Sequence, residues 1–350
     1  MRYPHFLPEN GSIGFIAPSF GAATEPYCSA FQNARRKFEA LGYRTVTGPN
    51  AFAQNGIGIS NTPEACAAEV NDFFTRENVD VLLSCGGGEL MCTILDAVDF
   101  GSIQAAPPKW FMGFSDNTNL NFLLPTLCDT AAVYGPNAPA FGMEPWHQSL
   151  FDALALLSGK SSEFTNYSRW QYTALRDETH PLLPYHLDRK TVLHCYIPDE
   201  TGRLQETQAP VALHGRLLGG CLDLLFGLAG TSFDQIKPFL ERYANEAILW
   251  FFESCDLNAF DMERALWHLA HCGWFSHSSG FLIGRPLHFA EPLFGLDQYE
   301  AILHQLAKYR VPIIMDADFG HLPPALPLIN GAVATVSREQ NVLRLSYDFR

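Results

Sequence analysis

Short apolar runs that alternate with helical patterns constrain the fold of this chain more than any other feature. Through residue 114 the runs are "SIGFIAPSF", "RTVTGPN", "VDVLLSCGGG" and "KWFMGF", and helical segments separate them. In the first helical segment, Phe31, Ala34, Phe38 and Leu41 share one face. Strands that alternate with helices in this way predict a parallel sheet with helices on its faces.

A second alternating region begins near residue 211. The stretch "VALHGRLLGGCLDLLFGLAGTSFD" predicts a strand, a Gly-Gly turn and a helix, and the strands "AILWFFES", "GFLIGRPL" and "VPIIMDADFG" follow with helices between them. We predict an α/β protein with a first domain over 1–150, a connecting segment over 151–210 and a second domain over 211–350. The connecting segment is too aromatic for a disordered linker, and we expect it to cover part of the site.

Composition excludes several classes of function. A formal net charge of −14 argues against nucleic-acid binding, because neutralising phosphates needs clustered Lys and Arg. Neither a signal peptide nor a membrane-length apolar stretch stands out, and the nine cysteines lack CxxC spacing. We therefore expect a cytoplasmic enzyme with buried thiols, no metal and no membrane partner.

The segment "FMGFSDNTNL" raises the question of whether Ser115 is a nucleophile or an ordinary helix cap. A serine on a sharp strand-to-helix turn exposes its hydroxyl, and the N–H of Asp116 then becomes an oxyanion donor. However, "GFSDN" holds only half of the G-x-S-x-G elbow, and a Ser with Asp beside it also suits an N-cap. The flanking residues leave both interpretations open.

The glycine-rich "SCGGGEL" ends the preceding predicted strand. Consecutive glycines let the backbone approach a ligand and direct an N–H at an oxyanion, which makes Gly86, Gly87 and Gly88 candidate binding residues. A phosphate loop is less suitable, because the Walker pattern and GxGxxG are both absent. A plain tight turn is the alternative, and spacing alone favours it slightly.

Candidate bases and acids lie in the second region. His321 follows the strand "IIMDADFG" and precedes two prolines, and His288 in "GRPLHF" is the second choice. Glu253 ends the apolar strand "AILWFFE", where a carboxylate needs a partner such as an imidazole. Asp256 and Asp316 are rival acids.

These motifs resemble the serine LD-carboxypeptidase family, which includes muropeptide LD-carboxypeptidases and microcin C immunity peptidases. The resemblance rests on the ordered set "IGFIAPS", "SCGGG", "GFSDNT", "GRLLGGCLDLL", "ILWFFES" and "DFGH", and it runs from Ile13 to about Val336. It implies a flavodoxin-like parallel-sheet N-terminal domain and a swivelling α/β C-terminal domain. It also implies a homodimer and no cofactor.

The resemblance further implies a Ser-Glu-His triad. Carried over motif by motif, the triad falls on Ser115, Glu253 and His321. The resemblance thus makes 1–150 the nucleophile domain and places the other two residues in the C-terminal domain. The family's oxyanion donors fall on the backbone N–H groups of Gly87 and Asp116.

Three departures from the family pattern bear on substrate choice. Muropeptide enzymes usually have Arg-Gly-Gly-Tyr-Gly where this chain has Cys85 to Glu89. Cys221 replaces a frequent asparagine, and Ser254 replaces the acid that commonly follows the catalytic glutamate. The triad residues themselves are all present.

The implied reaction is hydrolysis of an amide bond in a small peptide or peptidyl-nucleotide. The principal hypothesis is an LD-carboxypeptidase that acts on cytoplasmic muropeptides during peptidoglycan recycling. The alternative is an immunity-like peptidase that cleaves aminoacyl-nucleotide analogues, and the chain length and the connection "YSRWQY" favour it. Trp170 in this connection is a candidate for stacking on a base, and ordinary packing is the other role open to it. An unrelated α/β-hydrolase esterase and a non-catalytic binding protein on the same fold are further alternatives.

Overall fold

The structure, a computed structural model, describes residues 1–349, which fall into two compact units. Unit 1 comprises Met1–Ser162, Thr173–His186 and Pro327–Ile329, and unit 2 comprises Glu163–Tyr172, Leu187–Leu326 and the chain from Asn330 onward. The predicted boundaries at 150 and 210 differ from this division. The 151–210 segment is shared between the two units instead of forming a separate connection.

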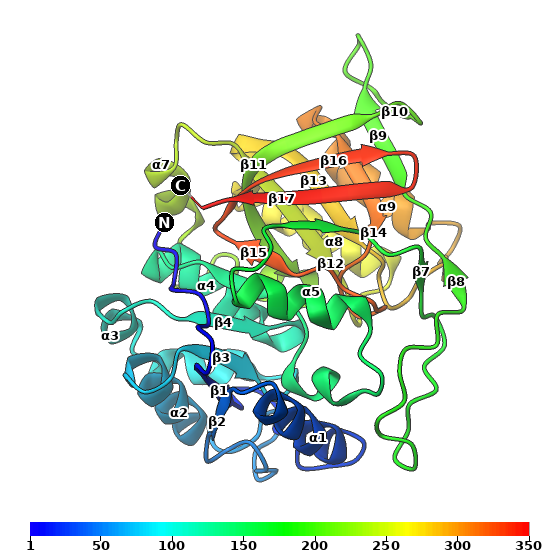
Figure 1. The fold of residues 1–350 in the computed structure, drawn as a ribbon. Helices are drawn as coiled ribbons and strands as arrows, with labels where there is room; N and C mark the ends of the chain where they lie inside the picture. Colours follow the sequence, from blue (N-terminus) through cyan, green and yellow to red (C-terminus); the bar gives the residue numbers. More distant parts are fainter. Residues whose placement is uncertain (350) are drawn as a thin grey trace. The chain divides into compact units, whose positions relative to one another are not determined.

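A six-stranded sheet with the order β15-β5-β4-β3-β1-β2 forms the centre of unit 1 (Figure 1). Its strands are β1 (Ser12–Ile16), β2 (Arg44–Thr47), β3 (Val81–Ser84), β4 (Trp110–Gly113), β5 (Ala132–Tyr134) and β15 (Leu328–Asn330). The first five pair in parallel, and the order 2-1-3-4-5 is that of flavodoxin-like folds. The predicted class of this region is confirmed.

Helices cover both faces of this sheet because neighbouring strand residues point in opposite directions. Phe15 packs against Phe31 and Phe38 of α1 (Tyr27–Ala40), with ring centroids 5.2 and 6.0 Å apart. Ile16 belongs to the opposite core, which contains residues of α2 (Pro63–Thr75), α3 (Phe100–Ala105) and α4 (Thr118–Cys128). Unit 1 also contains α5 (Gln148–Leu157) and the 3₁₀ helices η1 (Met91–Ala97), η2 (Ser115–Asn117) and η3 (Ala138–Gly142).

Unit 2 contains a nine-stranded sheet with the order β10-β9-β14-β13-β12-β11-β16-β17-β6. The parallel strands β11 to β14 lie at its centre, and antiparallel strands complete both sides. The bounds are β6 (Glu163–Thr165), β9 (His194–Pro198), β10 (Leu204–Glu206), β11 (Val211–Cys221), β12 (Ile248–Glu253), β13 (Ser278–Gly284), β14 (Ile313–Ala317), β16 (Val333–Glu339) and β17 (Val342–Asp348).

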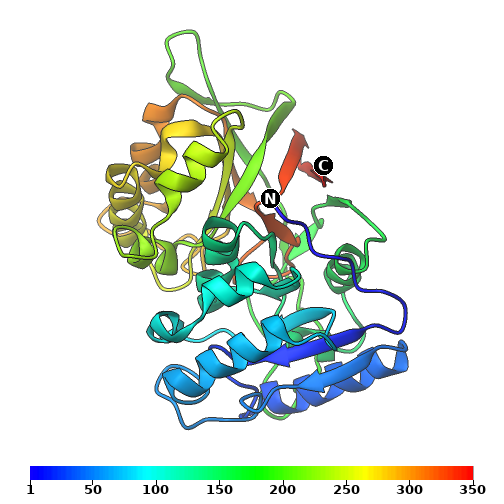
Figure 2. The same cartoon turned by 90° about the vertical axis from the view of Figure 1, so that its left-hand side faces the viewer.

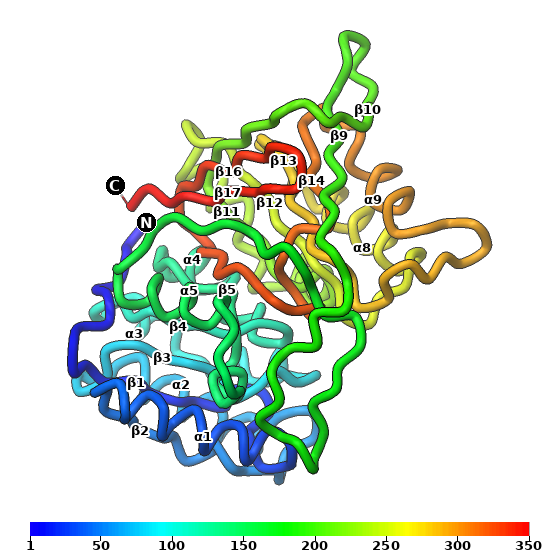
Figure 3. Tube along the Cα trace, turned by 45° about the vertical axis from the view of Figure 1, so that its right-hand side comes forward, coloured from blue at the N-terminus to red at the C-terminus, as the bar shows by residue number. Residues whose placement is uncertain are grey.

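The helices of unit 2 gather on one face of this sheet (Figure 2). They are α6 (Leu222–Leu228), α7 (Ile236–Arg242), α8 (Ala259–His271) and α9 (Gln298–Leu306), together with the 3₁₀ helices η4 (Trp274–His277) and η5 (Ala307–Tyr309). A separate two-stranded pair joins β7 (Arg169–Trp170) to β8 (Arg189–Lys190). The β9–β10 hairpin projects beyond the body of the unit (Figure 3).

The predicted Gly-Gly turn is wrong, because β11 continues unbroken through both glycines to Cys221. A Cβ atom on Gly219 would lie 1.8 Å from the carbonyl oxygen of Phe251 on the neighbouring strand β12. The glycine therefore serves a close approach between two parallel strands. Sequence alone cannot distinguish this from a turn, since both uses select glycine.

Replacing Gly219 tests this close approach. We expect Gly219→Ala to lower the free energy of unfolding by at least about 2 kcal/mol, because the methyl group must displace backbone in a packed sheet. Gly227→Ala is the matched control: it lies inside α6 with no atom within 4 Å of the place that its new methyl group would occupy, and it should stabilise by up to about 1 kcal/mol. Chemical denaturation of both variants measures the difference, and equal stabilities would contradict the steric explanation.

Candidate active site

Ser115 occupies a strained position at the carboxyl end of β4. Phe114 is extended and is the N-cap of η2, whereas Ser115 is the first residue inside that helix, with φ +64°. A positive φ is uncommon for a residue with a side chain and is typical of a nucleophile elbow. Since Phe114 holds the cap position, the N-cap interpretation of Ser115 does not describe this turn.

Asparagine side chains hold the turn in place. Asn117 donates to the carbonyl oxygens of Gly86 (2.7 Å) and Phe114 (3.1 Å), so it joins the Gly-rich loop to the serine turn. Asn121 donates to the carbonyl oxygen of Gly113 at 2.7 Å. Hydrogen bonds from these two asparagines therefore hold the backbone on both the Gly113 and the Phe114 side of the turn.

Gly87 lies directly beside the serine side chain. A Cβ on Gly87 would be 3.0 Å from Cβ and 3.2 Å from Oγ of Ser115, which explains why a glycine stands here. The carbonyl oxygen of Gly87 accepts a 2.7 Å hydrogen bond from the N–H of Phe20 in the loop that follows β1. The ends of β1, β3 and β4 thus meet at one edge of the sheet, where doubly wound folds bind their ligands.

The other two glycines have packing reasons of their own. A Cβ on Gly86 would lie 2.8 Å from the carbonyl oxygen of Phe20, and one on Gly88 would lie 2.0 Å from Oγ of Ser19. Both glycines therefore let the loop pack against the end of β1. A direct contact with substrate stays a prediction.

The side chain of Asp116 links three segments of unit 1. Its carboxyl group, with no exposed surface, accepts hydrogen bonds from Oγ of Ser19 (2.5 Å), the N–H of Met91 (2.9 Å) and Nδ2 of Asn119 (3.1 Å). Burial raises the pKa of Asp116 to about 6. The backbone N–H of Asp116 lies in the first turn of a helix, where amide donors have no acceptor within the helix.

Glu253 and His321 are paired in unit 2. Glu253 is the last residue of β12 and is 2% exposed, and its Oε2 lies 2.7 Å from Nδ1 of His321. Burial is the largest single influence and opposes protonation of the imidazole, but the Glu253 charge and the hydrogen bonds with Cys255 and Glu253 together outweigh it and raise the pKa of His321. The pair can therefore orient the imidazole and stabilise its cation.

Gly320 makes this pairing possible. It has φ +103°, and a Cβ there would lie 2.6 Å from Oε2 of Glu253. Only glycine lets the chain cross the carboxylate this closely and place the next residue, His321, on it.

The rival residues named from the sequence have other partners. His288 pairs at the surface with Glu291, 2.8 Å away. Asp316 accepts a 2.7 Å hydrogen bond from the hydroxyl of Tyr299, and the N–H of Asp256 donates to Asp223 at 2.7 Å. The structure brings neither carboxylate to His321 in place of Glu253.

A buried ion pair supports the loop that carries His321, and no local pattern in the sequence indicates it. Arg285, 1% exposed, donates to the carbonyl oxygen of Asp316 at 2.7 Å and forms an ion pair with Asp318. The carbonyl oxygen of Asp318 in turn accepts from the N–H of Leu326 at 2.7 Å. Burial raises the pKa of Asp318. The loop between β14 and β15 is therefore held on each side of His321.

Trp170 packs within unit 2. It is 4% exposed, its Nε1 donates to the carbonyl oxygen of Lys190 at 3.1 Å, and the guanidinium carbon of Arg285 lies 4.7 Å from the ring centroid. The ring of Phe289 meets it edge-on at 5.1 Å. These contacts favour the packing role, which the sequence leaves open beside base stacking.

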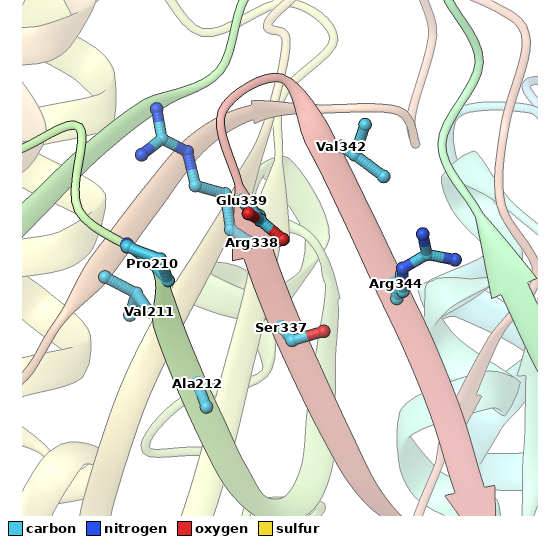
Figure 4. Close-up of a pocket in the computed structure, with 8 residues that line it drawn as sticks. All are labelled: Pro210, Val211, Ala212, Ser337, Arg338, Glu339, Val342 and Arg344. Carbon is cyan, nitrogen blue, oxygen red and sulfur yellow. The ribbon is translucent and has the colours of Figure 1, made fainter.

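One surface hollow lies apart from these residues. It has a volume of about 220 Å³ on the sheet formed by β11, β16 and β17 (Figure 4). Arg338 in its lining is 1% exposed and donates to the carbonyl oxygens of Thr207 and Leu193. The guanidinium of this arginine thus donates to backbone carbonyl oxygens within the unit, and we assign the hollow no catalytic role.

Two sequence models of protein domains match this chain. The LD-carboxypeptidase N-terminal domain matches residues 13–135, and the LD-carboxypeptidase C-terminal domain matches residues 214–336. A candidate carboxypeptidase of Vibrio cholerae is 25% identical over 99% of this chain and 98% of its own length. The murein tetrapeptide carboxypeptidase of Pseudomonas aeruginosa is 26% identical over 39% of this chain and 43% of its own length.

Solved structures of the microcin C7 self-immunity protein MccF share the fold. A variant in complex with adenosine monophosphate has a TM-score of 0.81 at 20% identity and covers 99% of both chains. The complex of the same protein with aspartyl sulfamoyl adenosine has a TM-score of 0.79 with the same identity and coverage. The likeness confirms the predicted class of fold, a parallel-sheet N-terminal region followed by a second α/β region. Among the helices within residues 1–349, none has the length and apolarity to cross a membrane.

The raised pKa of Asp116 gives a prediction for stability. Its folded-state pKa of about 6 lies above the usual value near 4, so its stabilising contribution is fully present below about pH 4 and is lost as pH rises through 6. We expect the wild type to gain about 3 kcal/mol relative to Asp116→Asn between pH 8 and pH 4, since one pKa unit corresponds to about 1.4 kcal/mol. Urea denaturation at several pH values measures the difference, and parallel curves for the two proteins would refute the assignment.

Proposed function

Because this chain belongs to the LD-carboxypeptidase family, we propose that it is a serine carboxypeptidase whose triad is Ser115, Glu253 and His321. The observation that carries the proposal is the 2.7 Å contact between the buried Glu253 carboxylate and Nδ1 of His321. Oriented in this way, the imidazole carries its proton on Nδ1 and leaves Nε2 as a base. The elbow conformation of Ser115 supports its role as the nucleophile.

The proposed reaction proceeds by acyl transfer. Oγ of Ser115 attacks the carbonyl carbon of the scissile amide while Nε2 of His321 takes the hydroxyl proton. The N–H groups of Gly87 and Asp116 bind the oxyanion, and Glu253 stabilises the imidazolium. His321 then gives its proton to the leaving amine, and a water molecule hydrolyses the acyl-enzyme by the same route.

The proposed substrate is a murein-derived peptide. One relative is named a murein tetrapeptide carboxypeptidase, and a full-length relative is a candidate carboxypeptidase. Such an enzyme removes the terminal D-alanine of a tetrapeptide at the bond that follows an L-configured centre. The corresponding role is peptidoglycan recycling. On the ground of the family resemblance, we propose that the enzyme acts in the cytoplasm and forms a homodimer.

An aminoacyl-nucleotide analogue is the second candidate substrate. The structural likeness to MccF covers 99% of both chains, whereas the murein enzyme matches 39% of this chain. MccF has been solved in complex with aspartyl sulfamoyl adenosine, whose amide resembles the bond that the alternative reaction would cleave.

Product analysis decides between these substrates. We expect the wild type to release alanine from a murein tetrapeptide with at least about tenfold higher kcat/KM than it cleaves aspartyl sulfamoyl adenosine, since tenfold corresponds to about 1.4 kcal/mol of transition-state stabilisation. Mass spectrometry follows both reactions, with Ser115→Ala as the matched control. The opposite ratio would support the second candidate, and failure on both would exclude both substrates.

The triad also predicts how substitutions combine. Ser115→Ala and His321→Ala should each lower kcat by about 10⁴-fold or more, and the double variant should be no slower than the worse single variant, because the residues act as one unit. Glu253→Gln should be impaired through loss of imidazole orientation. His288→Ala, which removes a surface histidine paired with Glu291, serves as the control. Losses that multiply in the double variant would show that Ser115 and His321 act independently.

A further inference from the structure

The thiol of Cys221 lies beside the proposed catalytic pair but has no part in the proposed reaction. Cys221 ends β11, has no exposed surface, and is the register partner of Glu253 on the parallel neighbour β12. One ligand atom from each of Cys221, Glu253 and His321 lies within 4.8 Å of the other two. Within residues 1–349, this is the single group of three such side chains with that spacing.

A thiolate, an imidazole nitrogen and a carboxylate oxygen form a ligand set suited to zinc. Zn²⁺ binds sulfur at about 2.3 Å and nitrogen or oxygen at about 2.0–2.2 Å, so tetrahedral ligands lie roughly 3.3–3.6 Å apart. The 2.7 Å separation between Oε2 of Glu253 and Nδ1 of His321 would have to open by less than about 1 Å. The partly exposed imidazole offers a route to the site, and a water molecule can take the fourth position.

The surroundings of Cys221 support a cation. Its Sγ donates to Oδ2 of Asp223 at 3.3 Å, so a carboxylate lies against the thiol. Asp223 is itself held by the backbone N–H groups of Cys255 (3.1 Å), Asp256 (2.7 Å) and Leu257 (3.2 Å). A carboxylate held in this way orients a metal ligand from the second coordination shell. Together with Glu253, it also concentrates negative charge at the carboxyl ends of β11 and β12.

We infer that Cys221, Glu253 and His321 form a binding site for a thiophilic divalent cation such as Zn²⁺. A further consequence rests on the proposed function: binding of the cation inhibits the peptidase. The Cys221 thiol loses its proton, through Asp223, to solvent, and the cation takes the place of the proton on Nδ1 of His321. The imidazole then carries its proton on Nε2, which can no longer accept the proton of Ser115.

Cobalt substitution tests binding without reference to activity. A Co²⁺–thiolate bond gives a charge-transfer absorption band, and we expect the wild type to show it at one equivalent and to lose it when Zn²⁺ is added. Cys221→Ser should abolish the band and weaken Co²⁺ binding by at least about 100-fold. Loss of an outer-shell partner costs at most about this much, so the loss of a direct ligand should exceed it. Absence of the band in the wild type would overturn the inference.

Cys272→Ser is the matched control. Cys272 is exposed and its Sγ lies 3.7 Å from Nε2 of His268, so it forms a Cys–His pair outside the proposed site. The band should persist in this variant. If the band is lost in Cys272→Ser and retained in Cys221→Ser, the metal binds at Cys272 and His268 instead, and the inference is overturned.

A second variant covers the case in which Cys221→Ser does not fold. Glu253→Gln keeps the thiol and should retain the band, and because Glu253 is a direct ligand it should bind Co²⁺ at least about 100-fold more weakly, beyond the range for an outer-shell partner. Unchanged affinity would show that Glu253 is not a ligand and would contradict the inference. Peptidase assays on metal-free wild type separate the two proposals. If the metal-free enzyme is active but Co²⁺ produces no band, the metal site is contradicted and the proposed function is not. If Co²⁺ produces the band but the metal-free enzyme cleaves no substrate, the proposed function is contradicted and the metal site is not.

Discussion

The hydrogen bond between the buried Glu253 carboxylate and Nδ1 of His321 is the interaction on which the account of function depends. A carboxylate at the end of an apolar strand is costly to bury unless a partner compensates its charge. The imidazole is that partner, and Gly320 is the residue that lets the chain place it there. Without the pair, the surrounding parallel strands would explain the fold but would supply no base.

Both units use the same geometric device. In each, parallel strands deliver their carboxyl ends to a common edge, so residues far apart in sequence come together there. Unit 1 brings Ser19, Gly87 and Ser115 to the edge of its flavodoxin-like sheet. Unit 2 brings Cys221, Glu253 and the loop that carries His321 to the edge of its own sheet. Cys221 is one of the three departures from the family pattern, and the proposed metal site uses its thiol as the soft ligand beside a carboxylate and an imidazole.

Local patterns in the sequence predicted much of the fold, because strand and helix periods depend on near neighbours. The strands that end near Ser19, Gly87 and Ser115 and those that lead to Glu253 and His321 were placed correctly, and the strand order agrees with the predicted class. The Gly-Gly pair in β11 was misread as a turn, since the reason for Gly219 is the Phe251 backbone on another strand. Part of the helical segment expected between the second and third of these strand ends is the 3₁₀ helix η1, and Asp99 then caps the separate helix α3. The supporting contacts of Asp116 and Arg285 were missed because their partners lie far away in sequence.

The central claim is that His321 activates Ser115, and mapping of a covalent adduct tests it most directly. A fluorophosphonate probe reacts with an activated serine hydroxyl, and mass spectrometry identifies the residue that carries the adduct. The account predicts an adduct on Ser115 that forms at least about 100-fold faster in the wild type than in His321→Ala, the lower range for loss of a general base. An adduct on another serine, or labelling of Ser115 at an unchanged rate without His321, would contradict it.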